Sequence, residues 1–305
     1  MENQIPNPPQ GNKKYFVISD VHSFYTPLMA ALKEAGYDKD NENHVLILCG
    51  DAFDRGDETL KVLNFLRSIP KERRVLVRGN HEALLRDCYK NKVFYDMDVH
   101  NGTDKTMCHL CRFDPNFQTK WYRKMPFMDL EEWNKGYEEA CHDYATKPFR
   151  SRNVKKVIDW IFSDDWVNYH EVGKYLFVHS WIPVKTWYDW DERKTRERLL
   201  EDWRNATQEE WEKAMWGCPW EHYLMGSIPK GKTIVCGHWH VMDFHTHLGH
   251  NIDGYKNRDI YYSDRLIALD ACTAMEPHVC NVLVIDGDKC YDKHGNVLTD
   301  RKEAI

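Results

Sequence analysis

Short aliphatic runs recur along the chain, and stretches with apolar residues at helical spacing separate the first of them. The run Val45-Leu46-Ile47-Leu48 is sharply bounded and rich in β-branched and aliphatic residues, which predicts a buried strand. Further strands are predicted over residues 14–18, 74–77, 175–178, 233–236, 266–269 and 282–285, with a short terminal hairpin around residues 290–297.

Two amphipathic stretches lie between the first three predicted strands. Thr26 can cap a helix that has Pro27 in its first turn and ends at Gly36. A second helix is predicted over about Glu58 to Ser68, and Pro70 ends it. Strands alternating with helices through short loops predict βαβ units and a largely parallel sheet.

Two longer stretches interrupt this alternation. Residues 86–170 mix charged and apolar positions at a spacing near 3.6 and are too long for a loop, which predicts a helical insertion. A second insertion over residues 183–231, also expected to be mainly helical, is rich in tryptophan. Its tryptophans predict a small hydrophobic core or, alternatively, an exposed aromatic wall that stacks a nucleobase. We expect one domain over residues 14–305, preceded by a disordered tail over residues 1–13.

Composition narrows the class of protein. With 42 Lys and Arg against 48 Asp and Glu, the formal net charge is −6, so nucleic acid is not an expected partner. No apolar run approaches the roughly 20 residues that span a bilayer, so we expect no membrane association. Ten cysteines, several of them in apolar runs, indicate a reducing cytoplasm. Cys108, Cys111 and Cys141 have the outline of a zinc site, but their spacing fits no standard zinc knuckle and favours free thiols.

Five predicted strands end in residues that can bind a metal ion. Because the carboxyl ends of parallel strands meet at one edge of a sheet, we expect these side chains to converge there. They are Asp20 and His22 after the first strand, then Asp51, Asn80 and His179, and finally His238 and His240.

Seven candidate ligands exceed the needs of one ion, which predicts two divalent ions. Carboxylate, imidazole and amide ligands without thiolate make Mn²⁺ the first choice and Fe or Zn²⁺ the alternatives. Asp51 is the candidate bridge between the ions. Asp20, His22 and His240 would complete one site, and Asn80, His179 and His238 the other. Such a pair lowers the pKa of a shared water and clamps the oxygens of an in-line displacement, which is the chemistry of phosphoryl transfer.

The motifs at the strand ends resemble those of calcineurin-like metallophosphoesterases. The Asp-Arg-Gly and Arg-Gly-Asn-His-Glu forms are similar to those of the PPP-type serine/threonine phosphatases and their bacterial and dinucleoside-tetraphosphatase relatives. The resemblance implies an α/β fold, namely an αββα sandwich of two mixed β-sheets flanked by helices, with a dimetal site at the strand ends. The matching segments are Asp20-x-His22, Gly50–Gly56, Arg78–Glu82, Val178-His179 and Gly237–His240.

The same resemblance implies roles for four further residues. His81 corresponds to the general acid that protonates the leaving oxygen, and Asp54 to the carboxylate that orients it. Arg55 and Arg78 correspond to arginines that contact the substrate phosphate. For Arg78 the alternative is a structural salt bridge, with Glu82 or Asp54 as its partner.

The chain departs from the PPP pattern at His240, which typical PPP protein phosphatases lack although the wider superfamily has it, and in two segments. Ser180-Trp181 follows the strand-end histidine, where PPP members usually have two glycines. The segment Met215–Pro219 lacks the arginine that usually follows a Leu-Trp motif, and Lys230 or Lys232 is the nearest replacement. These differences weaken the match to protein phosphatases and leave the match to phosphoesterases in general intact.

The sequence therefore predicts a dimetal phosphoesterase that hydrolyses phosphomonoesters by attack of a metal-bridging hydroxide. The resemblance implies phosphoserine or phosphothreonine of a phosphorylated protein, or a small phosphoester, as the substrate. The alternative is a nucleotide or dinucleoside-polyphosphate hydrolase, which the missing arginine favours. A catalytically silent binding module is the rival from another class, and the complete ligand set with the His81–Asp54 pair argues against it.

Overall fold

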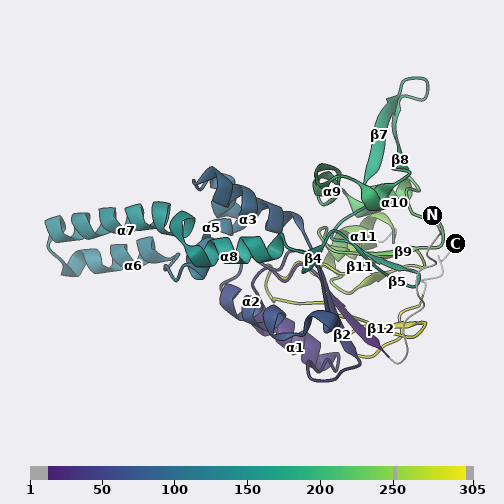
Figure 1. The fold of residues 1–305 in the computed structure, drawn as a ribbon, viewed down its shortest axis with the longest axis horizontal. Helices are drawn as coiled ribbons and strands as arrows, with labels where there is room; N and C mark the ends of the chain where they lie inside the picture. The colour runs from purple at the N-terminus through teal and green to yellow at the C-terminus, as the bar shows by residue number, and fades with distance from the viewer. Residues whose placement is uncertain (1–12, 250–252, 300–305) are drawn as a thin grey trace.

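A computed structural model describes residues 13–249 and 253–299; of the predicted tail, residues 1–12 lie outside the described residues. Its strands form two sheets and a separate hairpin (Figure 1). The six-stranded sheet has the order β13-β12-β1-β2-β3-β4 and the five-stranded sheet the order β10-β11-β9-β6-β5. The strands are β1 Lys14–Ile18, β2 His44–Cys49, β3 Arg74–Val77, β4 Trp166–Val167, β5 His170–Val172, β6 Tyr175–Phe177, β9 Thr233–Cys236, β10 Tyr261–Tyr262, β11 Leu266–Ala268, β12 Leu283–Asp286 and β13 Lys289–Tyr291.

Both sheets mix parallel and antiparallel pairs. In the first sheet β1, β2, β3 and β4 run parallel, whereas β12 pairs antiparallel with β1. In the second sheet β6, β9 and β11 run parallel, with β5 and β10 antiparallel at the edges. The carboxyl ends of four parallel strands in the first sheet and of three in the second thus each meet at one edge, and the predicted metal ligands follow strands of both sets.

Alternation along the strands separates three hydrophobic layers. Phe16 and Leu46 belong to a core shared with helices on the outer face of the first sheet. Their neighbours Val17 and Ile47 point to the other side and pack with Phe177 of the second sheet. Residues of the second sheet also pack outward, against helices on its far face. The fold is therefore the predicted αββα sandwich.

The helices that cover the sheets come from distant parts of the chain. Buried residues of α1, α2 and α8 line the outer face of the first sheet, and those of α9 and α11 the outer face of the second. The helices are α1 Tyr25–Glu34, α2 Thr59–Ser68, α3 Asn80–Asn91, α4 Asp96–Asn101, α5 Thr103–Leu110, α6 Phe117–Lys124, α7 Leu130–Arg150, α8 Arg152–Ile161, α9 Gln208–Ala214, α10 Pro219–Leu224 and α11 Val241–His247, with short 3₁₀ turns η1 Lys71–Arg73, η2 Met125–Phe127, η3 Trp203–Asn205 and η4 Gly254–Lys256. None of the helices within residues 13–249 and 253–299 combines the length and apolarity needed to cross a membrane.

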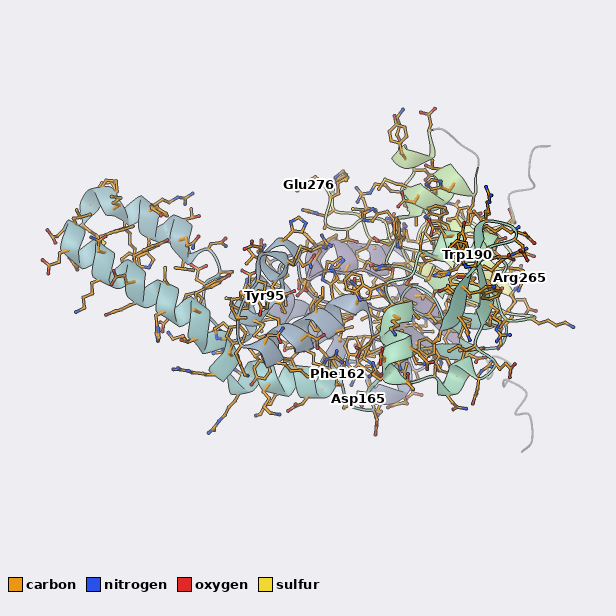
Figure 2. The ribbon with its side chains drawn as sticks, turned by 90° about the horizontal axis from the view of Figure 1, so that it is seen from above. Tyr95, Phe162, Asp165, Trp190, Arg265 and Glu276 are labelled. Atoms are coloured by element: carbon orange, nitrogen blue, oxygen red, sulfur yellow. The ribbon has the colours of Figure 1, made fainter. Side chains whose placement is uncertain are left out.

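The first predicted insertion is helical up to Ile161, and its last residues return to the sheets as β4 and β5. Its helices α6 and α7 extend side by side away from the sheets as an arm (Figure 1). The rings of Trp133 and Tyr137 stack at 5.0 Å within this arm, and the Trp133 indole donates to the Trp121 carbonyl. The arm therefore has its own aromatic packing. Figure 2 shows Tyr95 and Phe162 on the side of the body nearest the arm and Trp190 on the other side.

The second insertion differs from the prediction, because its first half is an antiparallel hairpin. Strands β7 Val184–Asp189 and β8 Lys194–Leu199 pair along six residues each and project from the body (Figure 1). Only its second half is helical. Its tryptophans are divided between the core and the surface: Trp203 and Trp211 are buried against the second sheet, as one alternative predicted, whereas Trp190 and Trp216 are exposed.

The start of α1 also differs from the prediction. Thr26 is not the cap, because the helix begins at Tyr25 and the Thr26 side chain donates to Glu58 at 2.8 Å. The Glu58 carboxylate also accepts from the Thr26 backbone N–H at 2.7 Å. A side chain from the next helical segment therefore satisfies this helix end, which local sequence rules do not detect.

Candidate active site

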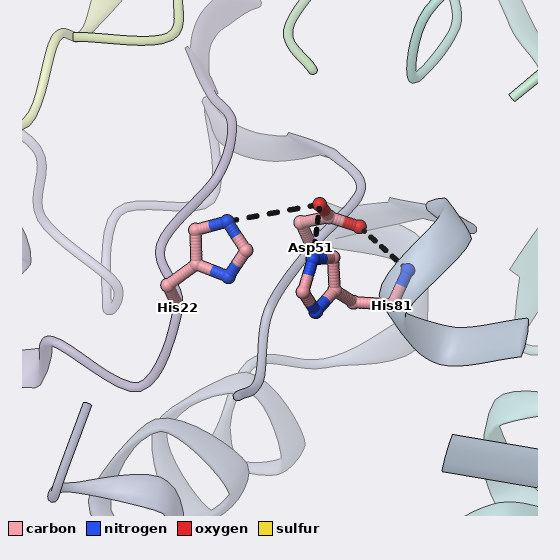
Figure 3. Close-up of side chains that lie close together, drawn as sticks. All are labelled: His22, Asp51 and His81. Atoms are coloured by element: carbon pink, nitrogen blue, oxygen red, sulfur yellow. Dashed lines mark hydrogen bonds and ion pairs between the residues drawn. The ribbon is translucent and has the colours of Figure 1, made fainter. Parts of the chain in front are cut away.

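Asp51 lies at the centre of the predicted constellation. Its Oδ2 atom is 3.7 Å from Nε2 of His22 and 3.9 Å from Nε2 of His81, and its Oδ1 accepts from the His81 backbone N–H at 3.1 Å. Figure 3 shows this carboxylate between the two imidazoles. On another side, Oδ1 is 3.4 Å from Nε2 of His179. One buried carboxylate thus faces three imidazoles.

Two groups of potential metal ligands share Asp51. Donor atoms of His22, Asp51 and His81 lie within 4.8 Å of one another, as do those of Asp51, His179 and His238. The second group agrees with the ligand set predicted from the sequence. The first group contains His81 in addition to His22. A cation held in this group would lie close enough to His81 for that residue to act either as a ligand or as an acid.

The remaining predicted ligands lie around these groups. Both carboxylate oxygens of Asp20 accept from the His238 backbone N–H, at 3.0 and 3.1 Å. His240 is more exposed, and its Nε2 lies 3.8 Å from Oδ2 of Asp270. A cleft of about 270 Å³ collects these side chains, and six of the seven predicted ligands line it: Asp20, His22, Asp51, Asn80, His238 and His240.

The contact between His179 and Asn80 tests whether the site suits a cation. Nδ1 of His179 lies 2.9 Å from the Cys49 carbonyl, which only accepts, so Nδ1 carries the hydrogen and Nε2 presents its lone pair. That lone pair faces Oδ1 of Asn80 at 2.7 Å. Protonation does not relieve the contact readily, because burial and the neighbouring His238 hold the pKa of His179 well below its ordinary value. A cation bound by both atoms would relieve it, so the site fits a metal.

A backbone carbonyl orients the His22 imidazole as it does that of His179. Its Nδ1 lies 3.0 Å from the Phe53 carbonyl, which directs Nε2 toward Asp51. Burial, followed by the nearby His81, lowers the pKa of His22, and burial lowers the pKa of His238 to about 4. Both imidazoles are therefore neutral at pH 7, which is the form that binds metal ions.

The buried carboxylates show the opposite shift. Burial, followed by the charge of Asp270, raises the pKa of Asp20 well above its ordinary value. Burial and the charges of Asp20 and Glu82 do the same to the pKa of Asp51. Several carboxylates in one desolvated volume repel one another in the metal-free protein, and a bound cation would remove that repulsion.

The loops that carry these residues have unusual backbone conformations. Asp20, His22, Asp51 and His238 all have positive φ, between 47° and 66°. Such conformations are uncommon for residues other than glycine and cluster at functional sites. Gly79 contributes by being small, since a Cβ there would overlap the Asp51 carboxylate. The chain turns sharply after each strand so that the side chains meet.

Glu82 holds two of these turns together. Its carboxylate accepts from the backbone N–H groups of Gly79, Asp51 and Ala52, at 2.7 to 3.0 Å. It is buried on the first turn of α3, so it fixes the loop after β2 against the loop after β3. The sequence motif includes Glu82, but its positioning role was not predicted.

His81 and Asp54 form the predicted pair. Nδ1 of His81 lies 2.8 Å from Oδ2 of Asp54, so the carboxylate accepts its hydrogen and Nε2 faces the Asp51 side. Thr103 donates to the same oxygen at 2.7 Å, and Thr106 accepts from the Asp54 backbone N–H. Both threonines belong to α5, within the first insertion, so this insertion helps to hold the pair. No strand-end motif marks them in the sequence.

The two predicted phosphate-binding arginines lie in different places. Arg55 is exposed and lines the cleft. Arg78 does not line it; its guanidinium donates to Asn168 at 2.9 and 3.1 Å and to the Trp166 carbonyl at 2.8 Å. The alternative of a salt bridge with Glu82 or Asp54 is not observed either, since these bonds tie Arg78 to the segment around β4. Phosphate contact by Arg78 stays a prediction, and the geometry favours Arg55.

Asp270 lines the cleft and was missed by the sequence analysis. It follows β11 by two residues, accepts from the Cys272 N–H at 2.7 Å and faces His240. Contacts with the Cys272 thiol and the Asp270 carboxylate raise the pKa of His240 to about 9. The rule used for the other strands, that polar residues after a strand end gather at one edge, applies to Leu269-Asp270 as well and would have found it.

Comparison with known proteins identifies the family. A family model described as calcineurin-like phosphoesterase matches residues 13–242, about three quarters of the chain. The chain belongs to the calcineurin-like phosphoesterases. This confirms the resemblance seen in the motifs, and it makes the protein a hydrolase that acts on phosphoric ester bonds. Its two groups of histidine and aspartate could hold the metal ions of such an enzyme.

Several curated relatives of this phosphoesterase carry the name "Bis(5'-nucleosyl)-tetraphosphatase, symmetrical". The protein from Hamiltonella defensa is 31% identical over 158 residues, covering 47% of this chain and 54% of the relative. The protein from Enterobacter sp. is 31% identical over 120 residues, covering 39% of this chain and 40% of the relative. The chain thus spans about half the length of these relatives or less.

A solved structure supports the fold. A cold-active protein tyrosine phosphatase covers 95% of this chain and 80% of its own, with a TM-score of 0.50 and 15% sequence identity. At this identity the likeness concerns the fold alone.

Proposed function

We propose that this phosphoesterase hydrolyses phosphate groups of small nucleotide substrates, with nucleoside and dinucleoside polyphosphates foremost. The observation that carries the proposed chemistry is the His81–Asp54 pair, set beside Asp51 in a cleft lined by six predicted metal ligands. The names of the curated relatives favour this substrate class over phosphoserine or phosphothreonine in proteins. All ten cysteines are free thiols in the structure, which supports the expected cytoplasmic location.

Two divalent ions fit the donor set. Asp51 with His179, His238 and Asn80 would hold one, and Asp51 with Asp20, His22 and His240 the other. Ions bound there would supply an activated water and would neutralise charge on the substrate phosphate. Mn²⁺ is the proposed metal, with Fe and Zn²⁺ as alternatives.

His81 would hold the proton that the leaving group needs. Asp54 accepts the Nδ1 hydrogen at 2.8 Å and so keeps Nε2 directed to the cleft. From there Nε2 would donate a proton to the leaving oxygen as its bond to phosphorus breaks. Asp54 is itself fixed by Thr103, so the ring has little freedom to turn away.

Arg55 would bind the phosphate oxygens. Its guanidinium carries a permanent charge, and its backbone is held by a bond from its N–H to the Asn101 carbonyl at 3.2 Å. Lys105 donates to the Arg55 carbonyl at 2.9 Å and steadies the same turn. With Arg78 engaged elsewhere, Arg55 is the arginine that lines the cleft among the described residues.

Protein phosphomonoesters are the second candidate, favoured by the match of the Asp-Arg-Gly and Arg-Gly-Asn-His-Glu motifs to PPP-type phosphatases. A substrate panel separates the two. Purified protein in Mn²⁺ would be given a phosphoserine peptide, a phosphothreonine peptide and diadenosine tetraphosphate, with products identified by mass. We expect kcat/KM to be highest for diadenosine tetraphosphate. Preference for a phosphopeptide would overturn the nucleotide proposal and leave the phosphoesterase assignment intact.

A further inference from the structure

The cleft has one aromatic wall, which the catalytic chemistry does not use. Trp216 lines the cleft with 54% of its surface exposed. Its ring lies 6.0 Å from the His238 ring, at a right angle to it. The half-exposed indole therefore offers an aromatic face to any planar group that enters the cleft beside the metal-binding side chains.

The position of Trp216 is fixed by its surroundings. It lies between α9 and α10, and its neighbour Met215 is buried. The backbone N–H of Trp216 donates to the Lys213 carbonyl at 3.2 Å, and the Ser180 hydroxyl donates to the Gly217 carbonyl at 2.7 Å. The loop therefore presents the indole from a backbone anchored on both sides.

A second layer supports this loop. The ring of Trp181 stacks on His222 at 5.4 Å, and His222 is bonded to the buried Glu197 of β8 at 2.7 Å. Gly217 allows this approach, because a Cβ there would lie 2.6 Å from Nε2 of His222. The backbone N–H of Trp181 also donates to the Ala214 carbonyl at 3.3 Å.

The two segments that depart from the PPP pattern thus contact each other. Ser180-Trp181 replaces the usual glycines, and Trp216-Gly217 stands where the usual arginine is missing. In the structure the first pair holds the second in place. What this region offers the substrate is therefore a flat aromatic surface instead of a second phosphate-binding cation.

We infer that Trp216 is a specificity-determining residue that stacks on the nucleobase of the substrate. This inference rests on the proposed function and names the part of the substrate that the cleft recognises beyond phosphate. An indole face favours a planar aromatic group, and stacking is insensitive to which base is present. A phosphoserine or phosphothreonine side chain has no such group.

Equilibrium binding of AMP and of inorganic phosphate to the metal-loaded protein tests the inference independently of turnover. Wild-type protein, Trp216→Ala, Trp216→Phe and Trp190→Ala would be compared by calorimetry. Trp190 is the matched control, since it is 82% exposed beyond the end of β7, on the hairpin, and does not line the cleft. We expect Trp216→Ala to weaken AMP binding about 5- to 100-fold, with phosphate binding unchanged. Trp216→Phe should stay within about threefold of wild type, and Trp190→Ala should change neither constant.

Equal losses for AMP and phosphate in Trp216→Ala would overturn the inference, because they would show a general disturbance of the cleft. Unchanged AMP binding in that variant, or binding of phosphate but not AMP by the wild type, would also overturn it. The substrate panel reports separately on the proposed function. A protein that binds AMP through Trp216 but hydrolyses only phosphopeptides would retain the stacking surface and lose the proposed reaction.

Discussion

At the residue scale, the geometry around His81 is compatible with two roles, general acid and metal ligand. It is bonded to Asp54, as an acid requires, yet its Nε2 lies within 3.9 Å of Asp51, within reach of a cation held there. The family resemblance favours the acid. The distinction can be measured, because loss of an acid and loss of a ligand affect different observables.

His81→Asn should lower kcat by about 10²- to 10⁴-fold, the usual contribution of general acid catalysis. The loss should be largest for substrates with poorly stabilised leaving groups, since these most need protonation. Metal content, measured by plasma mass spectrometry, should equal that of the wild type. A proportional fall in bound metal would instead identify His81 as a ligand.

Asp51 should affect stability differently with and without metal. Its raised pKa means that the folded, metal-free protein favours the protonated carboxyl group. The stability that this preference gives is fully present below the unfolded pKa and is lost as pH rises through the folded pKa. At pH 8 the metal-free Asp51→Asn variant should therefore melt at a higher temperature than the metal-free wild type.

Excess Mn²⁺ should reverse this order. The wild type gains about 2.7 kcal/mol when the metal stands at 100 times its Kd, whereas the variant lacks the shared ligand and should gain little. Calorimetric melting curves of both proteins, with chelator and with Mn²⁺, check the prediction. A metal-free variant less stable than the metal-free wild type at pH 8 would contradict the account of Asp51.

At the element scale, the ends of parallel strands explain how much of the site could be predicted. β1, β2, β3, β6 and β9 were each expected from their apolar runs, and the residues after them meet as predicted. Asp270 obeys the same rule and was overlooked. The rule works because parallel strands must end at a common edge, whatever joins them.

Contacts that depend on packing between distant elements could not be predicted. Thr103 and Thr106 reach Asp54 from α5, and Arg78 is engaged by Asn168, ninety positions away in the chain. The hairpin β7–β8 lies in a stretch that was expected to be helical. Its strands are only partly buried and carry many polar residues, so apolar periodicity gives little signal there.

The contribution of α5 to catalysis can be tested at Thr103. Thr103→Val keeps the shape of the side chain but removes the hydrogen bond to the Asp54 carboxylate, a charge-assisted bond of about 1.5–3 kcal/mol. We expect kcat to fall about tenfold, with metal content unchanged. Thr146→Val is the matched control, since Thr146 donates to the His142 carbonyl in an exposed hydrogen bond within α7 and its replacement should leave kcat unchanged. Equal kcat values in both variants would show that α5 does not contribute to catalysis through Thr103.

At the scale of the whole molecule, the arm of α6 and α7 extends away from the two sheets (Figure 1). Its tip exposes Phe127, and its base is joined to α5 through the bond from Tyr144 to Asp104 at 2.7 Å. The base therefore supports the active site through α5, whereas the tip is remote from it.

Replacing residues 118–140 by a short Gly-Ser linker should separate these roles. The change keeps Tyr144 and α5, so we expect kcat for a small substrate such as diadenosine tetraphosphate within about twofold of wild type. The melting temperature should change little, because the arm packs mainly on itself. A large loss of kcat with normal folding would show that the arm acts on the cleft.

The central claim is that Asp51 stands between two cations. Anomalous diffraction at the manganese edge, from crystals grown with Mn²⁺, tests it most directly. The account predicts two anomalous peaks, one on each side of the Asp51 carboxylate, the first shared with His179 and His238 and the second with Asp20 and His22. One peak, or peaks remote from Asp51, would contradict it.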